Sequence, residues 1–475
     1  MAKITPKEDM ASVSFETPLL DEQLAATTLG TYAPNHAIIR LSQDASFWLE
    51  ENEPTLDRLA VFVHEYAHYL HNFSTTSGIY GFVATLRLLA LFINTVDETG
   101  KSLGASALSA EASRELAAIV DWRLHLSGSY SQPFDMARMA QTELQVVDVS
   151  RHAATIDLSV QTLSIHRVSI TLAKASDPTI AGSFFLGTHV LMEGLAWEIE
   201  RILFASQGAD SGMLDSRFPT WPYKAPRAIF ESIAKHSLSP EQMAQVVLLS
   251  LLNTDPGDAF IAIADIFLGN ALSESPDQII ERLRDVTLKE LNSIKSAMIK
   301  SLTIETDRFS SKPTIHRGLK AMMKWAIEFL EVRSGDAFFE LNTIRAADRD
   351  DLVEMFKKFP PCPIIQETGP HSQDLELFFI ADRDPDHQIV NDLGVTQSLL
   401  HFASAHTNMR GIVPTPQARE GLCTFSGVCK LPLTVSSPEV CRRRPWESFA
   451  PQEGTGCWYA SGVRLARSVK SNSSQ

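Results

Sequence analysis

Residues 59–73 read LAVFVHEYAHYLHNF, and this stretch decides how the surrounding chain is expected to fold. Apolar residues flank a polar trio on both sides, which is typical of a helix buried in a protein core. Residues four apart on a helix lie on one face, so His64 and His68 present their imidazoles in the same direction. We expect a helix from Thr55 to about Phe73, with Pro54 directly before it.

The pattern His64-Glu65-x-x-His68 is typical of a catalytic zinc site. Such a site usually has three protein ligands and a water, so two histidines leave one ligand to be found. Glu65 lies about a hundred degrees around the helix from His64, so its carboxylate can reach a zinc-bound water without binding the metal. Glu65 is therefore the candidate general base. The plain alternative is a chance match on a helix that binds no metal.

The third ligand must come from another part of the chain. A histidine six residues after His68 is excluded, because that position is Ser74. A later apolar helix, residues 189–204 (HVLMEGLAWEIERILF), contains the pair Glu193-Gly194. Glycine inside a helix costs about 1 kcal/mol relative to alanine, so Gly194 indicates a close approach, which we expect to be to the metal helix.

HEYAH followed by LMEGLAWEIE resembles the gluzincin metallopeptidases, which include the aminopeptidase N and thermolysin-like zincins. It is most similar to the aminopeptidase N branch, in which a glutamate-glycine-aromatic-alanine segment carries a zinc ligand. The resemblance implies a divergent zincin-like catalytic core in which His64, His68 and Glu193 bind zinc and Glu65 is the base. The implied activity is hydrolysis of peptide bonds, most simply internal ones. Glu193 could instead be an ordinary surface or ion-paired glutamate.

The chain departs from that branch in several ways. The branch has a short interval between the two motifs, whereas 124 residues separate His68 from Glu193 here. The asparagine before the ligand is Met192, and the aromatic is Leu195. The motif that grips a substrate amino terminus is absent, so aminopeptidase specificity is not carried over.

Four further residues are candidates around the metal. Glu200 is seven residues after Glu193 on the same helix face and could orient a ligand, whereas Glu198 faces elsewhere. His71 could orient a ligand or contact substrate, or simply cap its helix. His189 could orient Glu193 or be a core histidine bonded to backbone. Gluzincins usually stabilise the oxyanion with a tyrosine or histidine, and the resemblance suggests Tyr223 for this role.

Four of the five cysteines, Cys423, Cys429, Cys441 and Cys457, lie in one C-terminal stretch with 5, 11 and 15 residues between them. These spacings are wider than the tight pairs of a zinc ribbon. A second, structural zinc ion, an iron–sulfur cluster, and four independent thiols all remain open. The run Arg442-Arg443-Arg444 is basic and could dock an acidic partner or form a solvated face.

Composition sets the broad class. The chain has 475 residues, 44% hydrophobic and 21% charged, which is ordinary for a globular protein. Its net charge of −15 argues against broad binding of nucleic acid or acidic membranes. The N-terminus lacks the apolar segment of a secretory signal, and the most apolar stretch, Phe82 to Val96, is short and contains Arg87. We expect a cytoplasmic protein.

Helical periodicity dominates, so the predicted fold class is α+β, predominantly α-helical, with a small β-sheet and a Cys-rich tail. Strands are expected at residues 36–41 and, as two strands, within 148–173. Helices are expected near 77–95, 105–125, 186–205, 227–237, 240–253, 258–272, 277–302 and 315–333. The predicted division is a catalytic core over 1–206, a helical domain over 207–345 and a mixed C-terminal region over 346–475.

Two other functions remain open. A non-catalytic helical protein could bind a partner or nucleic acid through its C-terminal cysteines, with structural metal only. A metal-dependent hydrolase could act on a substrate other than a peptide. A peptidase is favoured because a glutamate directly after the first histidine suits amide hydrolysis. The expected partner is a protein or peptide substrate.

Overall fold

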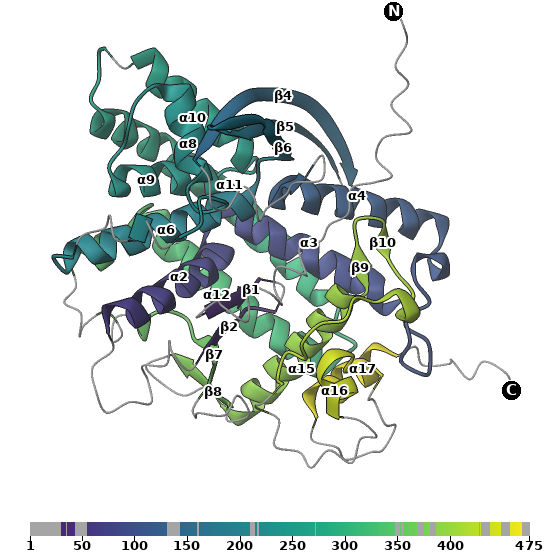
Figure 1. The fold of residues 1–475 in the computed structure, drawn as a ribbon. Coiled ribbons are helices and arrows are strands. Elements are labelled where there is room, and N and C mark those ends of the chain that lie inside the picture. Colours follow the sequence, from purple (N-terminus) through teal and green to yellow (C-terminus); the bar gives the residue numbers. More distant parts are fainter. Residues whose placement is uncertain are drawn as a thin grey trace, which may run out of the picture.

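The computed structural model describes residues 30–34, 36–42, 55–130, 143–158, 161–209, 214–215, 218–270, 272–346, 352, 356–367, 375–380, 386–426, 428, 438–447 and 457–467. The fold is α+β and mostly helical, as predicted (Figure 1). Two four-stranded sheets flank the helical body.

The first sheet pairs strands from residues 30–41 with strands from residues 362–380. Its order is β1-β2-β7-β8, formed by Gly30–Ala33, Ile38–Leu41, Cys362–Glu367 and Leu375–Ile380. β2 pairs parallel with β7, while the outer pairs are antiparallel. The predicted strand at 36–41 is confirmed as β2, whereas β7 and β8 were not predicted. β1 is an edge strand of this sheet.

The helix α2 spans Leu56–Ser74, as the motif predicted. Thr55 caps its start by accepting the backbone N–H of Arg58. Thr75 ends α2 and begins α3 (Thr76–Ile93), because its N–H donates to His71 O while its side chain accepts the N–H of Gly78. Gly78 is required at this corner, since a Cβ there would lie 2.5 Å from His71 O.

The helix α3 is long and apolar enough to cross a membrane by length and composition alone. Its 18-residue window has a mean hydropathy of 1.6, and 72% of it is buried inside the fold. Arg87, on this helix, is buried and donates to Glu305 at 2.8 Å. These features are those of a helix buried in the protein core.

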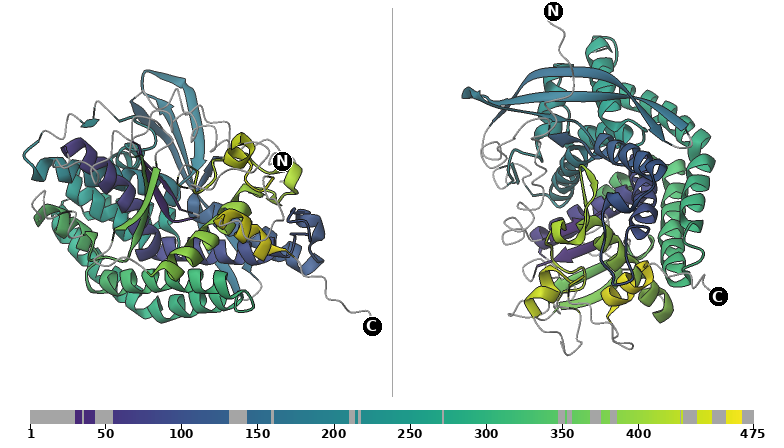
Figure 2. Two further views of the ribbon diagram at one scale, coloured as in Figure 1. Left: turned by 90° about the horizontal axis from the view of Figure 1, so that it is seen from below. Right: turned by 90° about the vertical axis from the view of Figure 1, so that its right-hand side faces the viewer.

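The second sheet is antiparallel, in the order β3-β6-β5-β4. The two strands predicted within 148–173 are β4 (Leu144–Leu158) and β5 (Gln161–Lys174), which pair antiparallel and extend beyond the predicted range. β3 (Ser129–Tyr130) and β6 (Asp177–Phe185) complete it. In Figures 1 and 2 this sheet arches over one end of the helical body, next to α4, α8 and α10.

The remaining helices agree with most of the predicted ranges. They are α4 (Ala110–Ser127), α6 (Thr188–Ser206), α8 (Ala225–Ala234), α9 (Pro240–Leu251), α10 (Pro256–Asn270), α11 (Pro276–Asp307), α12 (Pro313–Gly335), α13 (Phe339–Ala346), α15 (His387–Ala405), α16 (Pro438–Arg443) and α17 (Trp458–Ala466). α13, α15, α16 and α17 were not predicted. α15 is buried on nearly every side from Asp392 to Ala405, so it lacks the one-sided apolar stripe by which helices are recognised.

A continuous hydrophobic core includes buried residues from Ala37 to Ala466. Within it α6 packs against α2, α8 and α9, and α12 packs against α2, α11 and α15. This core draws on all three predicted domains, and their boundaries stay a prediction. The contact between α2 and α6 is the one that positions the candidate site.

Candidate metal centre

The polar trio of α2 lies inside the protein. His64, Glu65 and His68 are 6%, 7% and 8% exposed. Buried imidazoles and carboxylates are costly unless other groups compensate them. The compensating groups come from α6, which crosses α2 at this point.

The structure brings His64, His68 and Glu193 together. Glu193 Oε2 lies 3.5 Å from His64 Nε2 and 3.6 Å from His68 Nε2. The three ligand atoms all lie within 4.8 Å of one another. Zinc bonds of about 2.0–2.2 Å in tetrahedral geometry separate neighbouring ligand atoms by roughly 3.3–3.6 Å. The donor set and its spacing therefore fit a zinc ion.

Glu200 contacts His64 on the ring nitrogen that faces away from Glu193. Its Oε1 is 2.5 Å from His64 Nδ1, and the side chain is almost fully buried. A hydrogen bond at Nδ1 turns Nε2 toward Glu193 and settles which nitrogen is available to a metal. The sequence suggested this role from the seven-residue spacing between Glu193 and Glu200.

Glu65 lies beside the ligands but outside the group of three ligand atoms. Burial raises the pKa of Glu65 to about 7, with the imidazoles of His64 and His68 opposing the rise and other carboxylates adding to it. The strand β1 passes directly over it. A Cβ on Gly30 would lie 2.8 Å from Glu65 Cγ and 3.1 Å from Oε1, so only glycine leaves room there.

Two tyrosines border the site. The ring of Tyr223 lies 5.8 Å from that of His64, and burial holds the pKa of its phenol well above the usual value. A phenol that keeps its proton can donate a hydrogen bond. Tyr32, from β1, stacks on His68 with ring centroids 6.3 Å apart, and Asn72 donates to its hydroxyl at 3.0 Å. The sequence carried no signal for Tyr32, because β1 meets α2 only in the tertiary structure.

The segment that carries Tyr223 is attached to α6 next to the ligand. Gly194 packs against Pro226, because a Cβ on Gly194 would lie 2.5 Å from Pro226 Cγ. The expectation that Gly194 allows close approach to the metal helix is therefore corrected: the close partner is the first turn of α8. This contact fixes the start of α8 against α6 at Gly194, the residue directly after Glu193.

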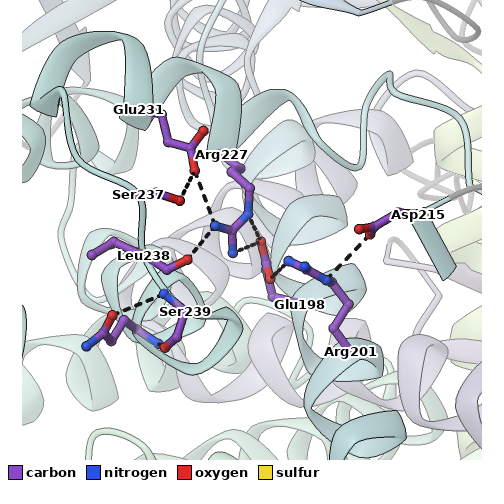
Figure 3. Close-up of polar contacts among 9 residues, drawn as sticks. Glu198, Arg201, Asp215, Arg227, Glu231, Ser237, Leu238 and Ser239 are labelled. Atoms are coloured by element: carbon purple, nitrogen blue, oxygen red, sulfur yellow. Dashed lines mark hydrogen bonds and ion pairs between the residues drawn. The ribbon is translucent and has the colours of Figure 1, made fainter. Parts of the chain in front are cut away.

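A second anchor joins the same two helices (Figure 3). Glu198 is 1% exposed and accepts from Arg227 at 2.8 Å and from Arg201 at 3.0 Å. Arg227 also donates to Leu238 O at 2.6 Å. Glu198 therefore faces away from the ligands, as the helical spacing indicated, and its partners hold α8 on α6.

The other two histidines that the sequence singled out are not among the ligands. His71 is fully buried, and its Nε2 lies 3.0 Å from Glu340 Oε1, so its side chain does more than cap the helix. His189 is exposed on the first turn of α6, which removes the alternative of a core histidine.

The C-terminal cysteines lie apart from this centre. Cys423 is buried, Cys441 and Cys457 are partly buried, and Cys429 lies outside the described residues. Arg442 and Arg443 are exposed, and Arg444 lies 3.1 Å from Glu447 and 3.4 Å from Glu420.

One more group among the described residues has ligand atoms this close together: His166, Asp255 and Asp258. This cluster is partly exposed, and its two carboxylates already have hydrogen-bonding or ion-pair partners in the protein. Arg151 lies 2.9 Å from Asp258, and the backbone N–H of His166 donates to Asp255 at 2.8 Å. We assign it no metal.

Comparisons with known proteins do not identify a family for this chain. No protein-family model matches the chain, and neither a curated protein nor a solved structure matches it.

Proposed function

We propose that this chain is a zinc-dependent metallopeptidase with a zincin-like core of the gluzincin type. The observation that carries the proposal is the convergence of His64 and His68 with Glu193, which comes from a helix 124 residues later. An ion pair between two buried histidines and a glutamate could arise without metal. The additional carboxylates of Glu65 and Glu200 around the same imidazoles favour a positive ion in their midst.

Each residue of the centre then has a distinct task. A bound zinc ion supplies Lewis-acid polarisation of the substrate carbonyl and makes a water more acidic. The Glu65 carboxylate accepts the proton of the attacking water and returns it to the leaving nitrogen. Tyr223 donates its hydroxyl hydrogen to the carbonyl oxygen as negative charge develops there. Glu200 keeps Nδ1 of His64 bonded and its Nε2 directed at the metal.

A peptide is the substrate that the surroundings favour. No strand among the described residues pairs with the outer edge of β1, which runs beside Glu65 at Gly30. An extended peptide can add to such an edge through backbone hydrogen bonds and lay a peptide bond near the base. A small molecule without an extended peptide backbone cannot form this series of hydrogen bonds with β1. A cytoplasmic setting is part of the proposal, because the described cysteines are thiols.

The test separates metal binding from chemistry. We expect wild-type protein loaded with zinc to cleave a peptide library, with products identified by mass spectrometry. Glu65→Gln should keep the ion at His64 and His68 and lose about 10²–10⁴-fold in rate, because only the base is removed. His64→Ala should lose both the ion and the activity.

The matched control is His152→Ala, because His152 is an exposed histidine on β4 far along the chain from both motifs. It should retain metal content and cleavage. Full activity in Glu65→Gln would show that the base is assigned wrongly. Absence of cleavage by zinc-loaded wild type would remove the peptidase proposal.

A further inference from the structure

Glu198 is a buried carboxylate that the proposed peptidase centre does not use. It lies on α6, five residues after Glu193, and its side chain is almost fully enclosed by the protein. A buried carboxylate is costly unless charged partners compensate it, and its printed partners are two arginines. Such an arrangement holds the partners in place, because moving either one leaves buried charge unpaired.

Each arginine contacts a different oxygen of Glu198 (Figure 3). Arg227 Nε donates to Oε1 at 2.8 Å, and Arg227 Nη2 lies 2.7 Å from the same oxygen. Arg201 Nη1 donates to Oε2 at 3.0 Å. Arg201 belongs to the same helix as Glu198, whereas Arg227 is in the first turn of α8. Glu198 therefore joins α6 to α8 by charge.

Tyr223 lies one helical turn before Arg227. Backbone hydrogen bonds run from one to the other, because the N–H of Lys224 donates to Thr220 O at 2.9 Å and the N–H of Ala228 donates to Lys224 O at 3.1 Å. Both bonds have the four-residue spacing of a helix. A displacement of Arg227 therefore moves Tyr223 with it.

The chain that leads into α8 is tied to the same turn of α6. Arg201 Nε lies 3.5 Å from Asp215 Oδ1, and the ammonium of Lys224 donates to Asp215 O. The ring of Trp197 lies beneath both cations, with its centroid 4.7 Å from Arg201 Cζ and 5.8 Å from Lys224 Nζ. This segment is therefore held on α6 at two points in addition to Arg227.

Aromatic side chains of the same segment face the metal centre. The ring of Phe218 lies 6.4 Å from that of His64, at an angle of 14°, and 5.1 Å from that of Tyr223. The ring of Tyr223 is itself 5.8 Å from that of His64. The segment thus directs its charged side chains to α6 and its aromatic side chains to a candidate zinc ligand.

We propose that Glu198 is a positioning residue for the peptidase reaction, which places the Tyr223 hydroxyl by holding Arg227 on α6. The inference rests on the proposed function, in which Tyr223 donates to the developing oxyanion. Such a donor must lie within about 3 Å of that oxygen, and a misplacement of about 1 Å can cost on the order of 10²-fold in rate. Glu198 acts only through the segment that it holds.

A double-mutant cycle tests whether Glu198 acts through Tyr223. In the zinc-loaded full chain, Tyr223→Phe should lower kcat about 10²–10³-fold. Glu198→Gln should lower kcat about 10–100-fold and leave KM within about threefold, because the donor is misplaced while the edge of β1 is intact. In the double variant, the loss should be no greater than in Tyr223→Phe alone.

Glu231→Gln is the matched control. Glu231 Oε1 also lies 3.4 Å from Arg227, but its side chain is 38% exposed, so its charge contributes little. This variant should match wild type in kcat and in zinc content.

Arg227→Lys is a milder change at the same contact, for use if Glu198→Gln does not fold. It keeps the positive charge and loses the fixed guanidinium geometry. It should lower kcat when Tyr223 is present and have no further effect in Tyr223→Phe.

A spectroscopic measurement reports the position of Tyr223 without peptidase activity. A fluorinated tyrosine is incorporated at this position alone, and its fluorine NMR resonance is sensitive to the neighbouring rings of His64 and Phe218. We expect Glu198→Gln and Arg227→Lys to shift or broaden the resonance. Glu231→Gln should leave it unchanged.

Three results would overturn the proposal. One is an unchanged fluorine resonance in Glu198→Gln, and another is a loss in the double variant equal to the product of the two single losses. The third is loss of zinc from Glu198→Gln, which would mean that Glu198 supports the ligands instead. If zinc-loaded wild type cleaves no peptide, the proposed function fails, while the fluorine measurement still decides whether Glu198 positions Tyr223.

Discussion

Gly194 is the residue on which the arrangement of α6 and α8 depends most directly. It follows the candidate ligand Glu193, and Pro226 occupies the space that a side chain would need. Proline rings adjust little, so a methyl group here must push the start of α8 away from α6. Tyr223 lies three residues before that point of contact.

We predict that Gly194→Ala destabilises the protein by about 1–3 kcal/mol, because overpacking at a close helix contact outweighs the better helix propensity of alanine. The measurement is urea denaturation followed by circular dichroism. Gly81→Ala in α3 and Gly269→Ala in α10 are matched controls, since a Cβ at either position meets nothing within 4 Å. Those two should stabilise by roughly 0.5–1 kcal/mol, and equal effects at all three sites would contradict the packing account.

At the scale of elements, polar contacts fix α2 at two points, at His64 through α6 and at His71 through α13. Beyond the ligands, His71 lies 3.0 Å from Glu340, which also pairs with Arg333 at 2.6 Å. Arg333 is fully buried on α12 and donates to Ser74 at 2.8 Å. These contacts tie the C-terminal turn of α2 to α12 and α13.

Removing the charge of Glu340 should leave Arg333 buried without its partner. We predict that Glu340→Gln lowers the free energy of unfolding at pH 7 by about 3 kcal/mol. On the same helix as Arg333, Glu331 pairs with Lys295 at 2.9 Å but is more than half exposed. Glu331→Gln should cost less than about 1 kcal/mol. Similar losses in the two variants would contradict the importance of burial.

The same carboxylate predicts an acid dependence. Although burial raises the pKa of Glu340, Arg333 and His71 outweigh it and hold that pKa at about 2, below the usual 4.5. Its contribution is therefore complete above pH 4.5 and is lost as the pH falls toward 2. Glu340→Gln should lack this part of the acid destabilisation.

At the scale of the whole molecule, His406 lies where α15, α3 and the C-terminal segment meet. Its Nδ1 and Nε2 lie 2.8 Å from Phe402 O and 3.2 Å from Thr415 Oγ1. Its ring packs against those of Phe92 and Trp446. Burial lowers the pKa of this histidine to about 4, although the bond to Phe402 O opposes the shift.

A histidine held neutral in the fold makes stability depend on pH. The unfolded chain takes up a proton below about pH 6.5 and the folded chain does not, so stability is lost as the pH falls from 6.5 toward 4. Between pH 7.5 and pH 5, wild type should lose about 2 kcal/mol more than His406→Gln, measured by urea denaturation. Equal losses in both proteins would mean that His406 does not titrate across the folding transition.

Several features followed from short-range patterns in the sequence. His64, Glu65 and His68 are on one buried helix because i,i+4 spacing and flanking apolar residues already specify a helix and its inner face. The roles of Glu200 and Glu198 followed from the same geometry on α6. The presence of two strands at β4 and β5 followed from the alternation of apolar and polar residues.

Other features had no local pattern to reveal them. α15 is buried almost all round, and β7 and β8 stand far along the chain from the β1–β2 pair that they extend. Tyr32 and Gly30 reach the metal centre from a four-residue strand. The true partner of Gly194 is a proline 32 residues later, and a glycine in a helix does not indicate which neighbour needs the space.

By itself the sequence determined which side chains share a helix face, because helix geometry depends only on positions a few residues apart. The tertiary structure alone decided that Glu193 lies 3.5 Å from His64 and that β1 covers Glu65. These contacts between residues far apart in the sequence depend on how the helices and strands pack into a common core. That packing is a sum over many weak contacts that no single stretch of sequence contains.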